Sequence, residues 1–400
     1  TWRDTKGVAM KVWLAALCAV IATGVSRPAA AEQCGGDFET WRAAVASQAS
    51  AEGVGAAGLD ALSQARFDTR VLARDRAQGV FTQDFIQFSS RMVNDYRLQH
   101  GAARMKKYGG AFSLAQQTYG VPAPVITAFW ALETDFGAVQ GDFSTLDALA
   151  TLAHDCRRPE LFRPHLIALL KLIDQGVLPA DVKGAWAGEI GQIQMLPGDY
   201  LEKGVDGDGD GRVDLRGSVA DVIMTAARLI AALGWRANEP WMQEVRVPET
   251  MPWEETGRTN RLPLAQWAAW GVTTRDGGTL GEGPDAGLVL PMGRKGPAFL
   301  VYANYDVYLE WNKSFVYTLT AAHLARRFAG DPPYRKGYPE PGLNPEEMRA
   351  LQEKLTARGH DVGGVDGVLG VNTREAVRKE QARLGMAVDG WPTQALLAAL

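Results

Sequence analysis

Residues 124–137 limit the possible folds most, because this apolar segment carries a carboxyl group on its hydrophobic side. Read as an α-helix, the segment places Phe129, Trp130 and Glu133 on one face. Burial of that face would disfavour the ionised form of Glu133 and raise the pKa of its carboxyl group. A carboxyl group that stays protonated near neutral pH can protonate a glycosidic oxygen. An ion pair between Glu133 and an arginine of a neighbouring helix explains the same pattern equally well.

The overall composition excludes several classes of protein. The 400 residues include 42 Lys+Arg and 46 Asp+Glu, which gives a net charge of −4. Nucleic-acid-binding domains are usually markedly basic, so we expect no nucleic-acid partner. Hydrophobic residues make up 46% of the chain and charged residues 22%, as in ordinary globular proteins and unlike a disordered tail or a coiled-coil rod. The length suffices for about two to three domains.

The first residues have the three parts of an export signal in order. Lys11 begins a short basic region, residues 12–25 form an apolar run, and residues 29–31 are three alanines. The apolar run is shorter than the about 20 residues that a membrane span needs. We therefore expect residues 1–31 to be a signal peptide cleaved near Ala31. The mature protein would then lie in the periplasm or cell envelope without stable membrane insertion.

Two cysteines remain after the predicted cleavage. Cys18 lies within the signal peptide, whereas Cys34 and Cys156 belong to the mature chain. An even pair of cysteines in an exported protein most simply forms a disulfide. This bond would join the beginning of the mature chain to the segment that follows Thr151.

Hydrophobic periodicity divides the mature chain into helical and strand-like parts. Residues 38–117 and 121–233 have mainly helical spacing, with many alanines. Residues 238–308 are richer in Trp, Pro and Gly and contain short alternating runs at 241–247 and 298–302. This pattern predicts a small β lobe inserted into the helical domain.

A Pro-rich and Gly-rich stretch separates the helical domain from the end of the chain. Residues 330–345 contain five prolines and three glycines, so we expect an interdomain linker at 330–343. The preceding domain would then cover residues 32–329, and a second domain would cover 344–400. The second domain is small enough to favour a binding module over a catalyst.

The last module contains a short internal repeat. The sequence Val-Asp-Gly occurs at 365–367 and again at 388–390, and each copy is followed by a threonine, Thr373 or Thr393. Each turn signal followed by a threonine predicts a capped helix. With a preceding helix, the module would contain three helices.

Four stretches of the chain match one family in the family's order. Residues 131–137 resemble the E-T-x-[FWY]-G signature, and residues 186–197 resemble the W-A-G-x-x-G-x-x-Q-F-M-P stretch of lytic murein transglycosylases of the membrane-bound B type. Residues 304–317 resemble the N-[FY]…[YW]-N-x-S-x-x-Y block of the same family. Residues 365–373 are similar to the common peptidoglycan-binding module. The chain thus resembles a soluble form of this transglycosylase.

The resemblance implies a mainly α (α+β) protein: a lysozyme-like helical catalytic domain with a small inserted β lobe, and a three-helix peptidoglycan-binding domain. It also implies that Glu133 protonates the oxygen that links N-acetylmuramic acid to N-acetylglucosamine. The acetamido group of the muramyl sugar would assist at C1 in place of a second carboxylate. The ionised Glu133 would then remove the proton of the C6 hydroxyl, which closes a 1,6-anhydro ring without consuming water.

The same resemblance assigns side chains to the binding of peptidoglycan glycan strands. These are Gln194, Asn304, Trp311, Asn312 and Tyr317. The chain departs from the family pattern at Met195-Leu196, at Trp311 and at Glu189, which adds a carboxyl group near the motif. Two alternatives stay open: a muramidase-type hydrolase, in which water attacks the sugar, and a non-catalytic peptidoglycan-binding protein.

An acidic segment matches most of a calcium-binding EF-hand loop. The ligands would be the carboxylates of Asp206, Asp208, Asp210 and Asp214, and the backbone carbonyl of Arg212. The twelfth position, which normally holds a bidentate glutamate, is Gly217. The pattern therefore predicts a structural calcium site of low affinity, or else a solvated acidic turn without metal. We expect the reaction itself to require no cofactor.

Overall fold

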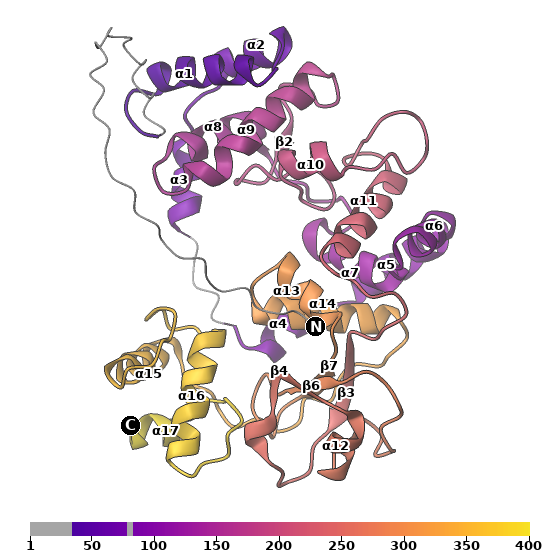
Figure 1. Cartoon of the computed structure of the whole chain (residues 1–400), viewed down its shortest axis with the longest axis vertical. Coiled ribbons are helices and arrows are strands. Elements are labelled where there is room, and N and C mark those ends of the chain that lie inside the picture. The colour runs from indigo at the N-terminus through magenta and orange to yellow at the C-terminus, as the bar shows by residue number, and fades with distance from the viewer. Residues whose placement is uncertain (1–33, 78–82) are drawn as a thin grey trace, which may run out of the picture.

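The computed structural model describes residues 34–77 and 83–400. The predicted signal peptide and its cleavage site near Ala31 lie outside these residues. Helices dominate the described part, which confirms the expected mainly helical fold class, and the strands are short (Figure 1). Within residues 34–77 and 83–400, no helix combines the length and apolar character that crossing a bilayer requires.

The helix that carries Glu133 lies at the centre of the helical part. This helix, α7 (Ala123–Thr134), buries 9 of its 12 residues. It packs against α5 (Asp95–Lys107), α6 (Gly109–Tyr119), α11 (Val219–Ala232) and α14 (Phe315–Phe328). A helix buried on nearly all sides explains why its sequence is almost continuously apolar.

Among the described residues, eight further helices complete this part. They are α1 (Phe38–Ala51), α2 (Ala56–Gln64), α3 (Thr69–Arg76), α4 (Phe85–Met92), α8 (Thr145–His154), α9 (Pro159–Asp174), α10 (Pro197–Lys203) and α13 (Tyr305–Trp311). The long helix α9 packs against α2, α8 and α10, and Figure 1 shows this group at the end of the molecule farthest from the sheet. A two-stranded antiparallel ribbon, β1 (Phe143–Ser144) and β2 (Lys183–Gly184), lies beside α8.

Helix α7 ends before the apolar segment does. Asp135, Phe136 and Gly137 have positive φ angles of 49°, 63° and 88°, so the backbone turns out of the helix at these residues. The Nε atom of Arg97, on α5, donates a hydrogen bond of 2.7 Å to Asp135 Oδ1. Glu133 therefore lies in the last turn of α7, and Asp135 forms its C-cap rather than a further helical position.

The inserted lobe is a five-stranded antiparallel sheet. Its strand order is β4-β6-β7-β3-β5, with β3 at Met242–Arg246, β4 at Gly257–Leu262, β5 at Thr273–Thr274, β6 at Ala286–Val289 and β7 at Ala298–Val301. The short helices η1 (Trp253–Glu255) and α12 (Leu264–Ala269) complete the lobe. Trp267, on α12, is fully buried and donates its indole N–H to the carbonyl of Ala286 at 2.8 Å. Both alternating runs read from the sequence contain a strand, β3 and β7.

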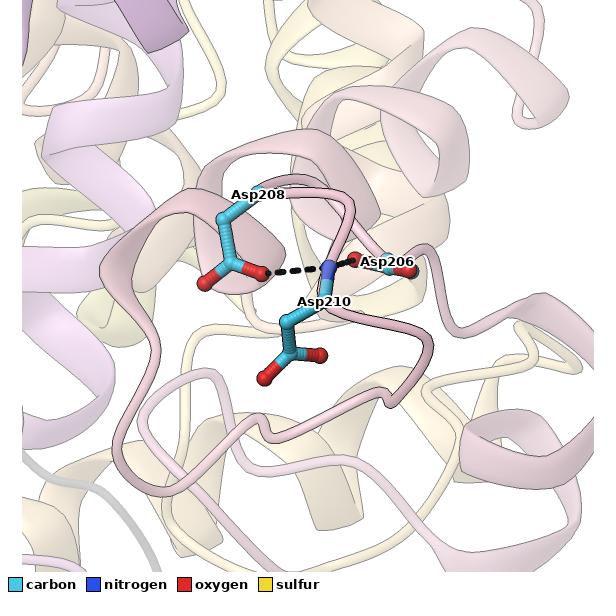
Figure 2. Close-up of side chains that lie close together, drawn as sticks. All are labelled: Asp206, Asp208 and Asp210. Atoms are coloured by element: carbon cyan, nitrogen blue, oxygen red, sulfur yellow. Dashed lines mark hydrogen bonds between the residues drawn. The ribbon is translucent and has the colours of Figure 1, made fainter.

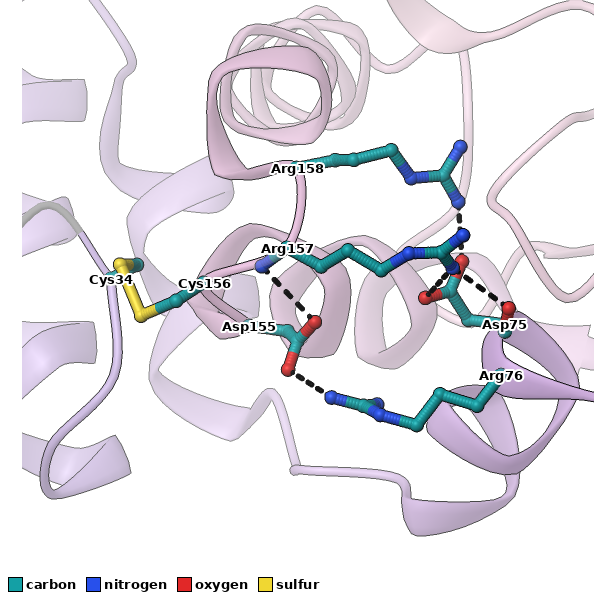
Figure 3. Close-up of polar contacts among 7 residues, drawn as sticks. All are labelled: Cys34, Asp75, Arg76, Asp155, Cys156, Arg157 and Arg158. Carbon is teal, nitrogen blue, oxygen red and sulfur yellow. Dashed lines mark hydrogen bonds and ion pairs between the residues drawn. A yellow bond between two sulfur atoms is a disulfide. The ribbon is translucent and has the colours of Figure 1, made fainter. Parts of the chain in front are cut away.

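A disulfide joins Cys34 to Cys156, as the sequence predicts (Figure 3). It connects the residues before α1 to the turn after α8. The two residues after Cys156 are arginines, and the carboxylate of Asp75 lies between their guanidinium groups (Figure 3). Arg157 Nη1 donates to Asp75 Oδ2 at 2.5 Å, and Arg158 Nη2 donates to Oδ1. Burial acts to raise the pKa of Asp75, but the two arginines outweigh it and hold this pKa below its ordinary value.

Replacing Asp75 by Ala is expected to lower the free energy of unfolding by about 2 kcal/mol at pH 7, the size of a hydrogen bond to a charged group. The side chain of Asp75 is 1% exposed, so its removal takes a buried carboxylate away from two partly exposed arginines. The loss should shrink as the pH falls through the folded-state pKa of Asp75, because the wild-type carboxylate is then protonated as well. Denaturant unfolding at several pH values measures this difference.

Asp155→Ala is the matched control for that substitution. Asp155 pairs with Arg76 at 2.7 Å in the same cluster, but its own side chain is 15% exposed, against 1% for Asp75. An exposed pair of this kind contributes about 0–1 kcal/mol. Equal losses for Asp75→Ala and Asp155→Ala would contradict the role assigned to Asp75.

The C-terminal module has the three predicted helices, α15 (Pro345–Ala357), α16 (Val371–Arg383) and α17 (Gln394–Ala399). Its internal repeat corresponds to two copies of one hydrogen-bonded turn. The Gln352 side chain donates to Asp366 and accepts from the Gly367 N–H. Gln381 makes the same two bonds to Asp389 and Gly390.

The two threonines of this repeat have different roles. Thr393 caps α17 by accepting the backbone N–H of Leu396, as predicted. The same prediction is wrong for Thr373, because α16 already begins at Val371. Thr373 is buried inside the helix and donates its hydroxyl to the carbonyl of Val362.

Residues 330–343 contain no helix or strand, but they lie against the rest of the protein. The ring of Tyr334 stacks on Phe85 with 5.1 Å between ring centroids, and its hydroxyl lies 2.7 Å from Ser89 Oγ. Trp391 of the module donates its indole N–H to the carbonyl of Glu340 and is 7% exposed. Trp391 belongs to the same hydrophobic core as α7. The module is therefore packed onto the helical domain and is not attached only through a flexible linker.

Candidate active site

The carboxyl group of Glu133 accepts two hydrogen bonds on one oxygen. Tyr317 donates its hydroxyl to Glu133 Oε1 at 2.6 Å, and Trp311 donates its indole N–H to the same atom at 2.9 Å. The Trp311 ring stacks on Phe129, with 4.4 Å between ring centroids. Glu133 Oε2 receives no hydrogen bond from the residues described. One oxygen is thus held in place, and the other is left for a further partner.

Burial governs the protonation of Glu133. Desolvation raises the pKa of this carboxyl group above its ordinary value of 4.5, and the hydrogen bonds from Tyr317 and Trp311 offset only part of that rise. The alternative of an ion pair with arginine does not fit the structure, because the neighbouring Arg97 pairs with Asp135 at 2.7 Å. The side chain keeps partial contact with solvent. It can therefore act as a proton donor to a molecule that binds there.

A short turn between α13 and α14 brings both donors to Glu133. Trp311 is the last residue of α13, and α14 begins at Phe315. Asn312 Oδ1 accepts the backbone N–H of Ser314 at 2.8 Å, and Ser314 Oγ in turn accepts the N–H of Tyr317 at 3.3 Å. The resemblance assigned Trp311, Asn312 and Tyr317 to the glycan strand. In the structure Trp311 and Tyr317 donate to the acid, and Asn312 shapes the turn that separates them.

Gln194 lies on a tight turn near this site. Its backbone has a positive φ of 50°, and its side chain donates to the carbonyls of Gln140 at 3.3 Å and Gly191 at 3.0 Å. The turn is closed by a β-bridge between Ile190 and Met195. The side chain of Gln194 is half-buried, so it can still present a face to a ligand.

Gln192, which no sequence pattern singled out, ties this turn to α7. Its side-chain oxygen accepts the indole N–H of Trp130 at 2.9 Å, and its backbone carbonyl accepts the hydroxyl of Thr134 at 2.6 Å. Its side-chain nitrogen donates to the carbonyl of Arg216 at 3.0 Å. Gln192 is buried, so its role is to fix the turn beside the last residues of α7.

Asn304 does not fit the predicted contact with substrate. It is fully buried, and its side-chain nitrogen donates to the carbonyls of Arg236 at 2.8 Å and Glu239 at 2.9 Å. Its side-chain oxygen accepts the N–H of Arg236 at 2.7 Å. All of these partners belong to the backbone before β3. Asn304 therefore holds the start of α13 against that segment and is not available to a sugar.

Glu189 adds a second carboxyl group near the acid. Desolvation raises the pKa of Glu189, and the charge of Glu133 raises it further. Glu189 Oε2 is buried without a hydrogen-bond partner among the described residues. The site thus holds two carboxyl groups that both resist ionisation, and Glu133 is the one with side-chain donors directed at it.

The acidic loop brings three of the four predicted carboxylates together. The carboxylate oxygens of Asp206, Asp208 and Asp210 lie within 4.8 Å of one another (Figure 2). Asp206 already accepts the backbone N–H of Gly211 at 2.8 Å. Asp214 is directed elsewhere, because its Oδ1 accepts the backbone N–H groups of Arg216 and Gly217, at 2.9 Å each. The predicted fourth carboxylate ligand is therefore not part of this cluster.

Other residues of the loop, and Asp221 beside it, determine its shape and the number of ligands that it can offer to a metal. Arg212 donates its N–H to Asp210 Oδ1 at 2.8 Å, which keeps the loop tight. Buried Asp221 accepts the N–H groups of Gly207 and Asp214 and so holds both ends of the loop. A Cβ atom at Gly217 would lie 2.5 Å from Asp214 Oδ2. A donor set of carboxylates fits a hard cation such as Ca²⁺, but it provides fewer ligands than a complete EF-hand.

Family models match nearly the whole described chain. The Transglycosylase SLT domain matches residues 37–326, and the Putative peptidoglycan binding domain matches residues 344–400. The chain is 29% identical over 248 residues to membrane-bound lytic murein transglycosylase B of Escherichia coli strain K12. This match covers 61% of the chain and 67% of that protein.

Solved structures agree with these matches. SltB3 from Pseudomonas aeruginosa, in complex with NAG-anhNAM-pentapeptide, is 37% identical with a TM-score of 0.84, covering 91% of this chain and 99% of that one. The E. coli lytic transglycosylase Slt35, in complex with calcium, is 28% identical with a TM-score of 0.63, covering 74% and 96%. The chain therefore belongs to the SLT-domain family of lytic murein transglycosylases, lyases that act on peptidoglycan, and it ends in a peptidoglycan-binding domain.

Proposed function

We propose that this lytic transglycosylase cleaves the β-1,4 bond between N-acetylmuramic acid and N-acetylglucosamine, with Glu133 as the acid and then the base. The observation that carries this proposal is the environment of Glu133. Its carboxyl group is desolvated, free of any ion pair among the described residues, and held by Tyr317 and Trp311 through one oxygen. Such a group donates a proton readily at neutral pH and is oriented to take one back.

Each step of the proposed reaction is balanced. Glu133 gives its proton to the glycosidic oxygen as the C1–O bond of the muramyl sugar breaks, and the sugar's own acetamido oxygen supports C1. The ionised Glu133 then takes the proton of the C6 hydroxyl as the C6 oxygen bonds to C1. The product ends in 1,6-anhydro-N-acetylmuramic acid, and Glu133 is protonated again. The relative SltB3 was crystallised with a NAG-anhNAM-pentapeptide, which supports this product.

The half-buried side chains around Glu133 are proposed to contact the glycan strand. Gln194 and Asn312 would offer amide groups to the sugars, while Trp311 and Tyr317 hold the acid. The peptidoglycan-binding domain would keep the enzyme on the insoluble polymer and raise the local concentration of substrate.

Mass spectrometry of fragments released from purified sacculi tests the proposed reaction. Anhydro ends are one water molecule lighter than reducing ends, so every muramyl end released by the wild-type enzyme should have the lower mass. Reducing ends alone would show that the protein is a muramidase-type hydrolase. Sacculus binding without any soluble fragments would show that it is a non-catalytic binding protein.

We also propose that the protein is exported to the periplasm after cleavage near Ala31. The order of basic, apolar and small residues at the start of the chain supports export. Peptidoglycan, the substrate of the family, lies outside the cytoplasmic membrane. N-terminal sequencing of the protein from a periplasmic fraction should begin at Glu32, whereas a chain that retains residue 11 would contradict cleavage.

A calcium site of low affinity is proposed at Asp206, Asp208 and Asp210. Their clustered oxygens support it, as does the complex of the relative Slt35 with calcium. With a dissociation constant near 1 mM, about 10 mM Ca²⁺ should stabilise the protein by about 1.4 kcal/mol. Asp208→Asn should reduce this stabilisation, whereas Asp181→Asn, at an exposed site outside the loop, should not. An unfolding midpoint that does not change with Ca²⁺ would contradict the site.

A further inference from the structure

Arg374 of the C-terminal module reaches into the helical domain. Its guanidinium carbon lies 4.9 Å from the centroid of the Phe315 ring and 5.9 Å from that of Trp391. Its Nη2 atom donates to the carbonyl of Pro291 at 2.7 Å. Burial lowers the pKa of Arg374 to about 10, so the group is still charged at neutral pH. A buried guanidinium over an aromatic face is a strong cation–π contact.

Phe315, whose ring lies under this guanidinium, begins α14, the helix that carries the Tyr317 hydroxyl bonded to Glu133. Phe315 is the first residue of α14, and Tyr317 is the third. Tyr317 donates to Glu133 at 2.6 Å, and its own backbone N–H is bound by Ser314, the residue before Phe315. A displacement of Phe315 therefore moves the hydroxyl that orients Glu133.

We propose that Arg374 is a positioning residue for the active site: by stacking on Phe315 it fixes the first turn of α14 and, through it, the hydroxyl of Tyr317 on Glu133. The module then supports catalysis by ordering the active site, besides binding polymer. This inference rests on the proposed role of Glu133 as acid and base. Arg374 contacts no reacting atom and acts only through Phe315 and Tyr317.

Arg378 provides a matched control one turn further along α16. It also crosses between the module and the rest of the protein, donating to Thr256 Oγ1 at 2.9 Å and to the carbonyl of Glu254 at 2.8 Å. It donates as well to the carbonyl of Val388 in the module's own loop at 3.1 Å. Arg378 thus docks the module on the β lobe, whereas Arg374 contacts both the lobe, at Pro291, and α14, at Phe315.

The test compares Arg374→Ala with Arg378→Ala in the full chain, on a short soluble glycan, so that attachment to sacculi does not affect the rate. A small error in the position of a catalytic group can cost up to about 10²-fold, and we expect Arg374→Ala to lower kcat about tenfold. The KM should change by less than about twofold. The alkaline limb of the pH profile should move to higher pH, because a weaker bond from Tyr317 no longer favours ionised Glu133.

Arg378→Ala should keep kcat within about threefold and leave the pH limb in place, since its contacts lie away from α14. Equal effects of the two substitutions, or a lower kcat with an unmoved pH limb for Arg374→Ala, would overturn the proposal. If Arg374→Ala fails to fold, Phe315→Leu tests the same contact from the other side, and it should produce the same pH shift.

A double substitution tests whether Arg374 acts on Glu133 through the Tyr317 hydroxyl. In a Tyr317→Phe background, Arg374→Ala should move the pH limb no further, because the hydroxyl that it positions is already absent. Additive shifts would show that Arg374 acts by another route. An active Glu133→Gln variant would overturn the proposed function, whereas an inactive Glu133→Gln with no effect of Arg374→Ala would overturn this inference alone.

Discussion

Replacement of Glu133 by Gln is expected to lower kcat by at least about 10³-fold while the protein still binds sacculi. Glutamine has nearly the same shape, and its carbonyl oxygen can still accept the hydrogen bonds that Tyr317 and Trp311 now donate to Glu133. It can neither donate the proton that cleavage requires nor take one from the C6 hydroxyl. Turnover is measured as the release of soluble fragments, and binding by co-sedimentation with sacculi.

Glu189→Gln is the matched control for this substitution. Glu189 is a second carboxyl group of the same environment, but no side chain donates to its buried Oε2 among the described residues. We expect Glu189→Gln to keep kcat within about tenfold of the wild type. A variant pair with the opposite pattern, in which Glu189→Gln is inactive and Glu133→Gln active, would move the acid to position 189.

Replacement of Tyr317 by Phe is expected to lower kcat by about 10²-fold and to move the alkaline limb of kcat/KM to higher pH. The Tyr317 hydroxyl favours the ionised form of Glu133, so its removal raises the pKa of the carboxyl group further. Glu133 then stays protonated to higher pH, which extends the range of the acid step. The plateau rate falls all the same, because the carboxylate that must accept the second proton has lost one of its two orienting bonds.

Tyr308→Phe removes the same atom from a neighbouring helix and serves as the control. The hydroxyl of Tyr308 is buried and has no hydrogen-bond partner among the described residues. Its loss should leave kcat and the pH profile unchanged and should not lower the free energy of unfolding. An unmoved pH limb in Tyr317→Phe, or the same fall of kcat in both variants, would contradict the role of the Tyr317 hydroxyl.

Patterns among neighbouring residues correctly predicted one central helix and two strands, and the cysteine count predicted the disulfide. The apolar spacing around Glu133 predicted α7 and a raised pKa, and the alternating runs at 241–247 and 298–302 predicted two strands of the β lobe. Cysteine counting alone predicted the Cys34–Cys156 disulfide, which joins residues 122 positions apart. The helix and the strands follow from the spacing of residues close together in the sequence. The disulfide follows because only two cysteines remain after the predicted cleavage.

The partners of the acid depend on long-range packing. Tyr317 lies 184 positions from Glu133 along the chain, and only the resemblance to a known family placed it at the site. The same resemblance assigned Asn304 to the site. Among the described residues, however, its side-chain amide makes all of its hydrogen bonds with the backbone of Arg236 and Glu239. A motif shows that a residue type is required, but it does not distinguish a residue that binds a ligand from one that holds the backbone.

Composition does not reveal how the segment between the two domains packs. Five prolines and three glycines in 330–345 indicate an extended chain, and the segment indeed has no helix or strand. Composition says nothing of Tyr334 stacked on Phe85 or of Trp391 buried in the shared core. These contacts make the module part of one packed structure, which is why a residue of α16 can influence the active site.

The most direct test of this account is a titration of the Glu133 carboxyl group itself. Carbon-13 NMR of protein labelled at the glutamate side-chain carboxyl, compared with Glu133→Gln, identifies its resonance and follows it with pH. We expect a midpoint above the ordinary value of 4.5, and a still higher midpoint in Tyr317→Phe. A midpoint at or below 4.5 would mean that Glu133 is an ordinary ionised carboxylate at neutral pH and not the proton donor of this enzyme.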